Sequence, residues 1–167
     1  MQNYCVVETR IGFVALVGSG GKLVRSTLPK ASREEAITAL GAGLTESAVE
    51  DECAFGSLPG MLRDYGEGKQ VDFSNVPVDL SAFGKFHAAA LSACQKIPYG
   101  QLITYADLAR AAGVERACRA AGSAMAANRT PIIIPCHRVV ASGGRIGGFS
   151  SGLEWKRSLL KLEGVDI

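Results

Sequence analysis

The sequence predicts an α/β protein built from two parts. A small N-terminal β-sheet lobe with helices is expected over residues 1–78, and a mainly helical domain with a helix-turn-helix and a cysteine-bearing loop over residues 79–167. Three observations support this division. Short β-branched segments separated by turns open the chain, a polar stretch marked by glycine and proline covers residues 67–77, and apolar residues recur at helical spacing from residue 81.

The N-terminal lobe opens with three apolar segments at residues 4–8, 12–17 and 23–28, separated by Thr-Arg and by Gly-Ser-Gly-Gly. Segments of this length joined by tight turns predict an antiparallel meander. Ser32, followed by Arg-Glu-Glu, matches a capping box and predicts a helix start. Residues 54–65 are expected to form a second helix despite an internal Pro-Gly pair.

Three helices are predicted next. Helical spacing from residue 81 to Ile97, ended by Pro-Tyr-Gly, predicts a helix of about four turns. Thr104, with Asp107 three residues later, predicts the start of a second helix that ends at Gly113. A third, alanine-rich helix is expected over residues 115–127. Two short helices joined by a glycine-containing turn form a helix-turn-helix candidate, although a helical hairpin in a core shows the same pattern.

Composition and charge limit the class of protein. The 167 residues are 47% hydrophobic and 20% charged, as in ordinary globular proteins. No apolar run reaches the roughly 18 residues of a membrane span, and residues 1–10 lack a signal peptide's apolar segment. We therefore expect an intracellular protein, cytoplasmic or, in a eukaryote, nuclear. Residues 1–84 contain 7 basic and 11 acidic side chains, whereas residues 85–167 contain 11 and 5. This asymmetry indicates either a face for a polyanion or a solvated basic surface.

The cysteines are an odd number at wide spacing with no CxxC pair: Cys5, Cys53, Cys94, Cys118 and Cys136. With only two histidines beside them, they are poor material for a zinc site or a disulfide framework. We expect reduced thiols, all except Cys136 being buried structural residues. No metal and no cofactor is predicted.

Cys136 lies in the segment with the clearest chemical signal, Pro-Ile-Ile-Ile-Pro-Cys-His-Arg-Val-Val-Ala from residue 131. A strand-like apolar run delivers the thiol directly after Pro135, whose ring fixes φ and removes an N–H donor. A nearby imidazole and a positive charge favour the nucleophilic thiolate, and His137 and Arg138 supply both. Adjacent residues of an extended chain point in opposite directions, so His137 is expected to reach the sulfur through a turn or a bridging water. A third group should orient its ring.

This segment contains Pro-Cys-His-Arg-Val, and here the sequence resembles the O6-alkylguanine-DNA alkyltransferases, also called methylated-DNA–protein-cysteine methyltransferases. The resemblance runs in register from about Phe83 to Gly164. It is carried by Ile97-Pro-Tyr-Gly, Thr104-Tyr, Arg119-Ala-Ala-Gly, Asn128, Pro131 to Val139, Gly147-Gly-Phe-Ser and Leu159-Leu-Lys-Leu-Glu-Gly. In the N-terminal lobe the resemblance is only general.

The resemblance implies DNA repair by stoichiometric transfer of an alkyl group to Cys136 from O6-alkylguanine, and more weakly O4-alkylthymine, in duplex DNA. It implies a monomer that binds the minor groove through the helix-turn-helix and flips the damaged base. Flipping is needed because the target atom cannot be reached inside a duplex. The thioether product has no good leaving group, so turnover should stop after one event.

The resemblance also assigns site residues. The catalytic set is Cys136 as acceptor, His137 as its base through a water, Glu163 orienting His137, and Asn128 bridging the active-site loop to the DNA-binding motif. The flipped base would be held by Tyr105, Ser150, Phe149, Met125 and the carbonyl of Val139. DNA would be contacted by Arg119 as an intercalating finger and by Arg116, Thr104, Ala120, Ser123, Arg129 and Arg138.

Two positions depart from the family pattern. Phe149 stands where tyrosine is common, so either transfer is slower or another donor replaces the missing hydroxyl. Arg129 stands where proline is frequent after Asn128, either as a phosphate contact or as a solvated side chain. Two other classes of function remain open: a Cys-His hydrolase, which would need an oxyanion hole, and a non-reactive sensor of alkylated DNA, whose relatives replace the reactive cysteine.

Overall fold

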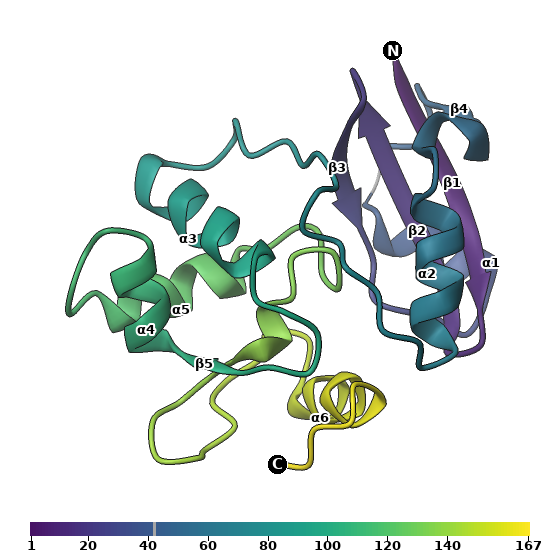
Figure 1. The fold of residues 1–167 in the computed structure, drawn as a ribbon. Helices are drawn as coiled ribbons and strands as arrows, with labels where there is room; N and C mark the ends of the chain where they lie inside the picture. Colours follow the sequence, from purple (N-terminus) through teal and green to yellow (C-terminus); the bar gives the residue numbers. More distant parts are fainter. Residues whose placement is uncertain (42) are drawn as a thin grey trace. The chain divides into compact units, whose positions relative to one another are not determined.

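The computed structural model describes residues 1–41 and 43–167. These residues form two compact units (Figure 1). Unit 1 contains Met1–Asp79 and Arg129–Pro131, and unit 2 contains Leu80–Asn128 and Ile132–Ile167. The expected fold class, a small N-terminal sheet with helices and a mainly helical C-terminal part, is confirmed. None of the helices in this described part of the chain is long and apolar enough to span a bilayer.

The sheet of unit 1 has the strand order β3-β2-β1-β4. The strands are β1 (Gln2–Thr9), β2 (Gly12–Ser19), β3 (Lys22–Ser26) and β4 (Val49–Glu50). The predicted antiparallel meander is correct, since β2 is antiparallel to both of its neighbours. β4, which the sequence did not indicate, adds a short parallel edge to β1.

The two helices of unit 1 cover opposite faces of this sheet (Figure 1). Ala36 and Leu40, from α1 (Arg33–Ala39) and its C-cap, pack with Ala15 and Val17 of β2. α2 (Leu58–Gly66) contacts β1. Because side chains alternate between faces, covering both faces buries consecutive residues, and Val14–Val17 of β2 are all buried.

Local signals explain where these helices begin. The Ser32 side chain accepts from Glu35 N at 3.1 Å, as the capping box predicts. The predicted helix over residues 54–65 is wrong at its start. A 3₁₀ turn over Glu52–Phe55 ends at Gly56, whose φ is 56°, and α2 begins only at Leu58. Pro59 then lies in the first turn, where its missing N–H breaks no helical hydrogen bond.

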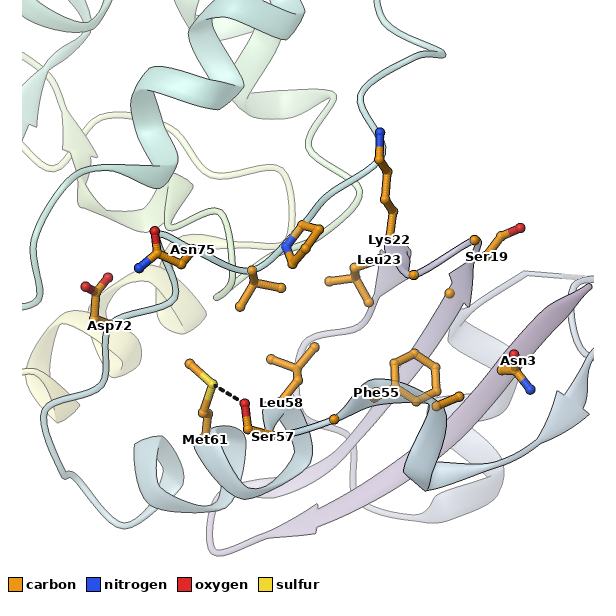
Figure 2. Close-up of a pocket in the computed structure, with 17 residues that line it drawn as sticks. Asn3, Ser19, Lys22, Leu23, Phe55, Ser57, Leu58, Met61, Asp72 and Asn75 are labelled. Atoms are coloured by element: carbon orange, nitrogen blue, oxygen red, sulfur yellow. Dashed lines mark hydrogen bonds between the residues drawn. The ribbon is translucent and has the colours of Figure 1, made fainter.

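Unit 1 contains a cavity of about 560 Å³ between the β2–β3 turn, residues 54–58 and residues 72–77 (Figure 2). Phe55, Leu58 and Met61 supply apolar lining, while Lys22 and Asp72 lie at its rim in the view of Figure 2. Its described lining includes neither cysteine nor histidine, so it lacks the thiol and the imidazole that the sequence singles out.

Unit 2 consists of four helices and a two-stranded parallel pair. The helices are α3 (Lys85–Gln95), α4 (Tyr105–Ala111), α5 (Cys118–Ala126) and α6 (Leu153–Leu162), and the strands are β5 (Ile103–Thr104) and β6 (Val139–Val140). α5 packs against both α3 and α4. The parallel pair brings the residues just before α4 beside the residues just after Cys136–Arg138, so segments far apart in sequence meet at one place.

Helix starts in unit 2 differ from the prediction at two of three places. Thr104 caps α4 as expected, accepting from Asp107 N at 3.1 Å. α3 begins at Lys85 and spans 11 residues, shorter than predicted. α5 begins at Cys118 instead of residue 115 because Arg116 has a φ of 63°, a left-handed conformation that a right-handed helix does not contain.

The apolar run before Cys136 is not the strand that the sequence indicated. Residues 132 and 133 form a turn, and Ile132 has a φ of 74° although it is only 1% exposed. Positive φ is strained for a β-branched residue and persists only where the surroundings fix it. Burial of Ile132–Ile134 supplies that restraint, and the resulting turn directs the chain toward Cys136.

Candidate active site

Cys136 lines a cavity of about 500 Å³ in unit 2. The other lining residues come from the start of α4, from α5 and from the loop before α6: Tyr105, Cys118, Gly122, Met125, Ala126, Gly148, Phe149 and Ser150. Cys136 is 6% exposed. Its thiol can therefore react only with a group that enters this cavity.

A tight turn presents Cys136 to the cavity. Pro135 has φ −80° and ψ 65°, the values of an inverse γ-turn, and Cys136 N donates to Ile134 O at 2.8 Å. Asn128 Nδ2 donates to the same carbonyl at 2.9 Å. Asn128 thus ties the end of α5 to the cysteine loop. Cys136, His137 and Arg138 form one 3₁₀ turn and not an extended chain.

The electrostatic surroundings of the thiol are balanced between two effects. Burial raises the pKa of Cys136 above its ordinary value. A hydrogen bond from the Asn128 side chain, the charge of Lys156 and the backbone N–H groups of Cys136 and His137 act in the opposite direction and favour the thiolate. Burial wins, so the group is a thiol at neutral pH while the cavity contains no substrate. A base must accept its proton during reaction.

His137 and Glu163 form a buried pair next to Cys136. His137 is fully buried, and its Nε2 lies 2.5 Å from Glu163 Oε2. Burial lowers the pKa of His137, opposed by Glu163, and the imidazole is neutral at neutral pH. Burial by itself would raise the pKa of Glu163, but the hydrogen bonds and charges of His137 and Arg138 outweigh it and hold that pKa at about 2. A carboxylate that only accepts fixes the proton on Nε2, so Nδ1 is the basic nitrogen.

Arg138 has a different place from the one predicted. Its Nε donates to Glu163 Oε1 at 2.8 Å, its Nη2 to Glu163 Oε2 at 3.1 Å, and its Nη1 to Ile97 O at 2.6 Å. Gly100 N also donates to Glu163 Oε1, at 3.0 Å. Because Arg138 is 4% exposed and its charge is neutralised by Glu163, the prediction that it contacts DNA is wrong. The cation that acts on the Cys136 thiol is Lys156.

Lys156 is the site residue that sequence reasoning missed. It is fully buried in α6, and its Nζ donates to Val139 O at 2.7 Å and to Gly148 O at 2.9 Å. A signal was present, because residues 156, 159, 160 and 163 share the buried face of α6 at helical spacing. That spacing places Lys156 on the same buried face as Glu163, whereas a solvated lysine would lie on the exposed face of the helix.

The loop before α6 forms one wall of the cavity and packs against Tyr105. Tyr105 Oη donates to Gly148 O at 3.2 Å. A Cβ atom at Gly147, whose φ is 75°, would lie 2.9 Å from the Tyr105 ring. Only glycine permits this approach. The loop thereby brings Phe149, which is half-buried, and Ser150, which is exposed, to the cavity that Cys136 lines.

The residues expected to contact DNA have varied exposure. Arg119 and Ser123 on α5 are exposed, as are Arg116 before it and Arg129 after it, whereas Ala120 is half-buried. Thr104 caps α4. Met125, also on α5, is buried and faces the cavity of Cys136. One helix therefore has exposed cationic and small side chains as well as part of the cavity wall.

The prediction that four cysteines are buried structural residues is wrong for two of them. Cys5 and Cys94 are buried, but Cys53 and Cys118 are exposed. Cys118 is the first residue of α5 and lines the same cavity as Cys136. It is therefore the matched control for any experiment on the reactive thiol.

Fold and site define a two-part α/β protein with a buried cysteine in a cavity wall, a buried histidine–glutamate pair and a neighbouring pair of helices. Residues 85–165 match the family model described as the DNA-binding domain of 6-O-methylguanine DNA methyltransferase. The methylated-DNA–protein-cysteine methyltransferase of Methanopyrus kandleri is 48% identical over 109 residues, which cover 65% of this chain and 80% of that protein. The enzyme of the same name from Methanosarcina acetivorans is 34% identical over 162 residues, covering 96% and 97%. The chain belongs to this methyltransferase family.

Solved structures agree over nearly the whole chain. The Mycobacterium tuberculosis O6-methylguanine methyltransferase matches with a TM-score of 0.76 at 31% identity, covering 98% of this chain and 93% of that one. The same organism's OGT in complex with DNA matches with a TM-score of 0.77 at 31% identity, covering 96% and 92%. The similarity therefore includes unit 1, where the sequence motifs are weak.

Proposed function

We propose that this protein repairs DNA by transferring an alkyl group from the O6 atom of guanine in duplex DNA to Cys136. The observation that carries the proposal is the placement of a single buried thiol in the wall of a cavity, with a neutral histidine held by a carboxylate next to it. A thiolate aimed at an alkyl carbon and a base for its proton are the groups that such a displacement requires. O4-alkylthymine, which presents the same aromatic ether, is the weaker substrate.

The chemical step is an in-line displacement at the alkyl carbon. The bond from Cys136 Sγ to carbon forms while the bond from carbon to O6 breaks, and the electron pair of that bond stays on guanine. The thiol proton passes to His137 Nδ1 through a bridging water, and the departing guanine takes up a proton. The sum is a neutral thioether and unmodified guanine, so no cofactor is consumed.

Glu163 and Asn128 serve this step without touching the alkyl group. Glu163 keeps the proton on Nε2 of His137 and stabilises the imidazolium that forms during transfer. Asn128 holds the cysteine turn through Ile134 O and favours the thiolate through its hydrogen bond to Cys136. Both are positioning residues in this scheme.

The damaged base must leave the duplex to reach Cys136, since the thiol lies in the wall of a cavity and not on the surface. Exposed Arg119, in the first turn of α5, would enter the space that the extruded nucleotide leaves. Arg116 and Arg129 would contact phosphates, and exposed Ser123 would face the minor groove. One protein molecule suffices for one lesion, and we expect a monomer.

Within the cavity, Tyr105 and Ser150 would contact the flipped base, Ser150 at O6. The carbonyl of Val139 was expected to accept from the exocyclic amine of guanine. The Val139 oxygen already accepts from Lys156 Nζ, so the amine would donate to the second lone pair of that oxygen. The transfer leaves a thioether at Cys136, and turnover ends there.

Mass spectrometry with methylated duplex tests the proposal. Equimolar O6-methylguanine duplex should add one methyl group, about 14 Da, to the peptide containing Cys136, because this is the thiol with a neighbouring base, His137. Cys136→Ser should abolish the addition and retain DNA binding. Cys118→Ser, which alters a second thiol in the same cavity, should leave it intact. Methylation of Cys118, or many turnovers per molecule as in a hydrolase, would overturn the proposal.

A further inference from the structure

Lys156 is a buried cation whose charge has no carboxylate partner in the described part of the chain. Its side chain is fully buried, and among the described residues no acidic side chain forms an ion pair with it. Its Nζ instead donates to the carbonyls of Val139 and Gly148, and it lies 5.7 Å from the centre of the Tyr105 ring. Carbonyl dipoles and an aromatic face reduce the cost of a buried ammonium but do not neutralise it.

These contacts place Lys156 at the junction of the site. Val139 follows the 3₁₀ turn of Cys136, and Gly148 begins the cavity wall that continues with Phe149 and Ser150. Gly148 O accepts from both Lys156 and Tyr105. One ammonium thus joins the strand after Cys136 to the loop that lines the cavity of Cys136. Losing the ammonium would release that loop from the strand.

The group that can become its counter-charge is the thiol of Cys136. We propose that Lys156 is a positioning residue of the transfer reaction: it fixes the Gly148–Ser150 loop opposite the thiol and is the counter-ion of the Cys136 thiolate. The effect of Lys156 on alkyl transfer rests on the proposed function, but its effect on ionisation of the Cys136 thiol can be measured without DNA. The two groups act on one another, since each carries a charge that favours the charged form of the other.

Other titratable groups in the neighbourhood do not replace this cation. Burial lowers the pKa of Lys156, and the Cys136 charge opposes that shift. Tyr105 and Cys94 have raised pKa values through burial and are neutral at neutral pH. His137 is neutral, and Arg138 is neutralised by Glu163. Among the residues that the structure describes, Lys156 is therefore the cation whose charge remains available to the thiolate.

The test measures the thiol in DNA-free protein. Iodoacetamide labelling of the Cys136 peptide is followed against pH in three proteins: wild type, Lys156→Met and Lys161→Met. Methionine at position 156 keeps approximately the length of the lysine side chain and removes its charge. Lys161 is an exposed lysine on the same helix and serves as the matched control. We expect the labelling midpoint to rise by at least about half a pH unit in Lys156→Met only. One pH unit corresponds to about 1.4 kcal/mol of interaction between the two charged forms.

Transfer from free O6-benzylguanine is measured beside it. The rate for Lys156→Met should fall at least about tenfold at pH 7.4. It should recover in part at pH 9, because alkaline pH deprotonates the Cys136 thiol even without the lysine charge. A folded Lys156→Met with an unshifted midpoint, or with an equal loss at both pH values, would reduce Lys156 to a structural residue. The labelling experiment does not depend on DNA repair. Failure of the proposed function would be seen in a different measurement, in which wild-type protein takes up no methyl group from DNA.

A second measurement covers the case in which Lys156→Met does not fold. The titration of Lys156 is followed by NMR of its Cε in wild type and in Cys136→Ala, where no thiolate can form. The pKa of Lys156 should be lower in Cys136→Ala, because the favourable counter-charge is gone. Identical titration curves would overturn the assignment.

Discussion

Glu163 binds two neighbours at once: its Oε2 lies 2.5 Å from His137 Nε2, and its two oxygens accept a bidentate pair of hydrogen bonds from Arg138. All three side chains are buried. The carboxylate is therefore both the group that orients the base and the counter-ion of a buried arginine. Substitution at Glu163 should affect rate and stability together.

Glu163→Gln is expected to lose about 3–5 kcal/mol of unfolding free energy, because Arg138 remains buried without its counter-charge. Transfer by the folded fraction should slow at least about tenfold, since a neutral amide no longer stabilises the imidazolium of His137. Urea denaturation gives the first quantity, and single-turnover methyl transfer gives the second. Glu154→Gln, exposed in the same helix, is the control. Wild-type rate in a destabilised Glu163→Gln would make Glu163 a purely structural residue.

Acid should destabilise the protein through the same carboxylate. The pKa of Glu163 is about 2 in the folded state, below the ordinary value of 4.5. A group with a lowered folded pKa contributes stability that is fully present above the unfolded pKa and is lost as pH falls toward the folded one. Unfolding free energy should therefore decline between pH 4.5 and 2, with a smaller slope in Glu163→Gln. Equal slopes in the two proteins would contradict the lowered pKa.

Arg119→Ala should separate base extrusion from chemistry. Extruding a nucleotide costs a few kcal/mol and is required only in a duplex. We expect transfer from methylated duplex to fall at least about tenfold, and transfer from free O6-benzylguanine to stay within about twofold of wild type. The control is Arg157→Ala, another exposed arginine, on α6. Equal losses on both substrates would mean that Arg119 supports the cavity or the fold.

Phe149→Tyr should add a hydroxyl at a side chain that lines the cavity. If the leaving O6 lacks a donor there, single-turnover transfer should become several-fold faster, as expected for one added hydrogen bond of about 1 kcal/mol. Phe149→Leu measures the contribution of the ring alone. An unchanged rate in Phe149→Tyr would show that another donor, such as Ser150, already serves O6.

The chain's local signals were sufficient for much of the fold. The turns between β1, β2 and β3, the Ser32 and Thr104 caps and the end of α4 shortly before Gly113 all depend on residues within a few positions of one another. The wrong predictions, the start of α5 and the strand before Cys136, came from backbone conformations that no local sequence signal indicates. The positive φ of Arg116 delays α5, and the positive φ of Ile132 turns an apolar run that reads as a strand. For Ile132 the restraint is burial, which exists only in the folded protein.

For the site, the sequence by itself singled out the candidate nucleophile and the residues that accompany it. Cys136 follows a proline and precedes His137, and the linked motifs from residue 83 to 164 single out Asn128, Arg119 and Glu163. Tertiary structure decided their charges. Arg138 reads as a free cation beside the thiol, but the fold pairs it with Glu163. Lys156 reads as a surface lysine, but the fold buries it among carbonyls near Cys136. Charge state depends on burial and on partners 8 to 25 residues away in the chain, and these exist only once α6 has packed against the cysteine turn.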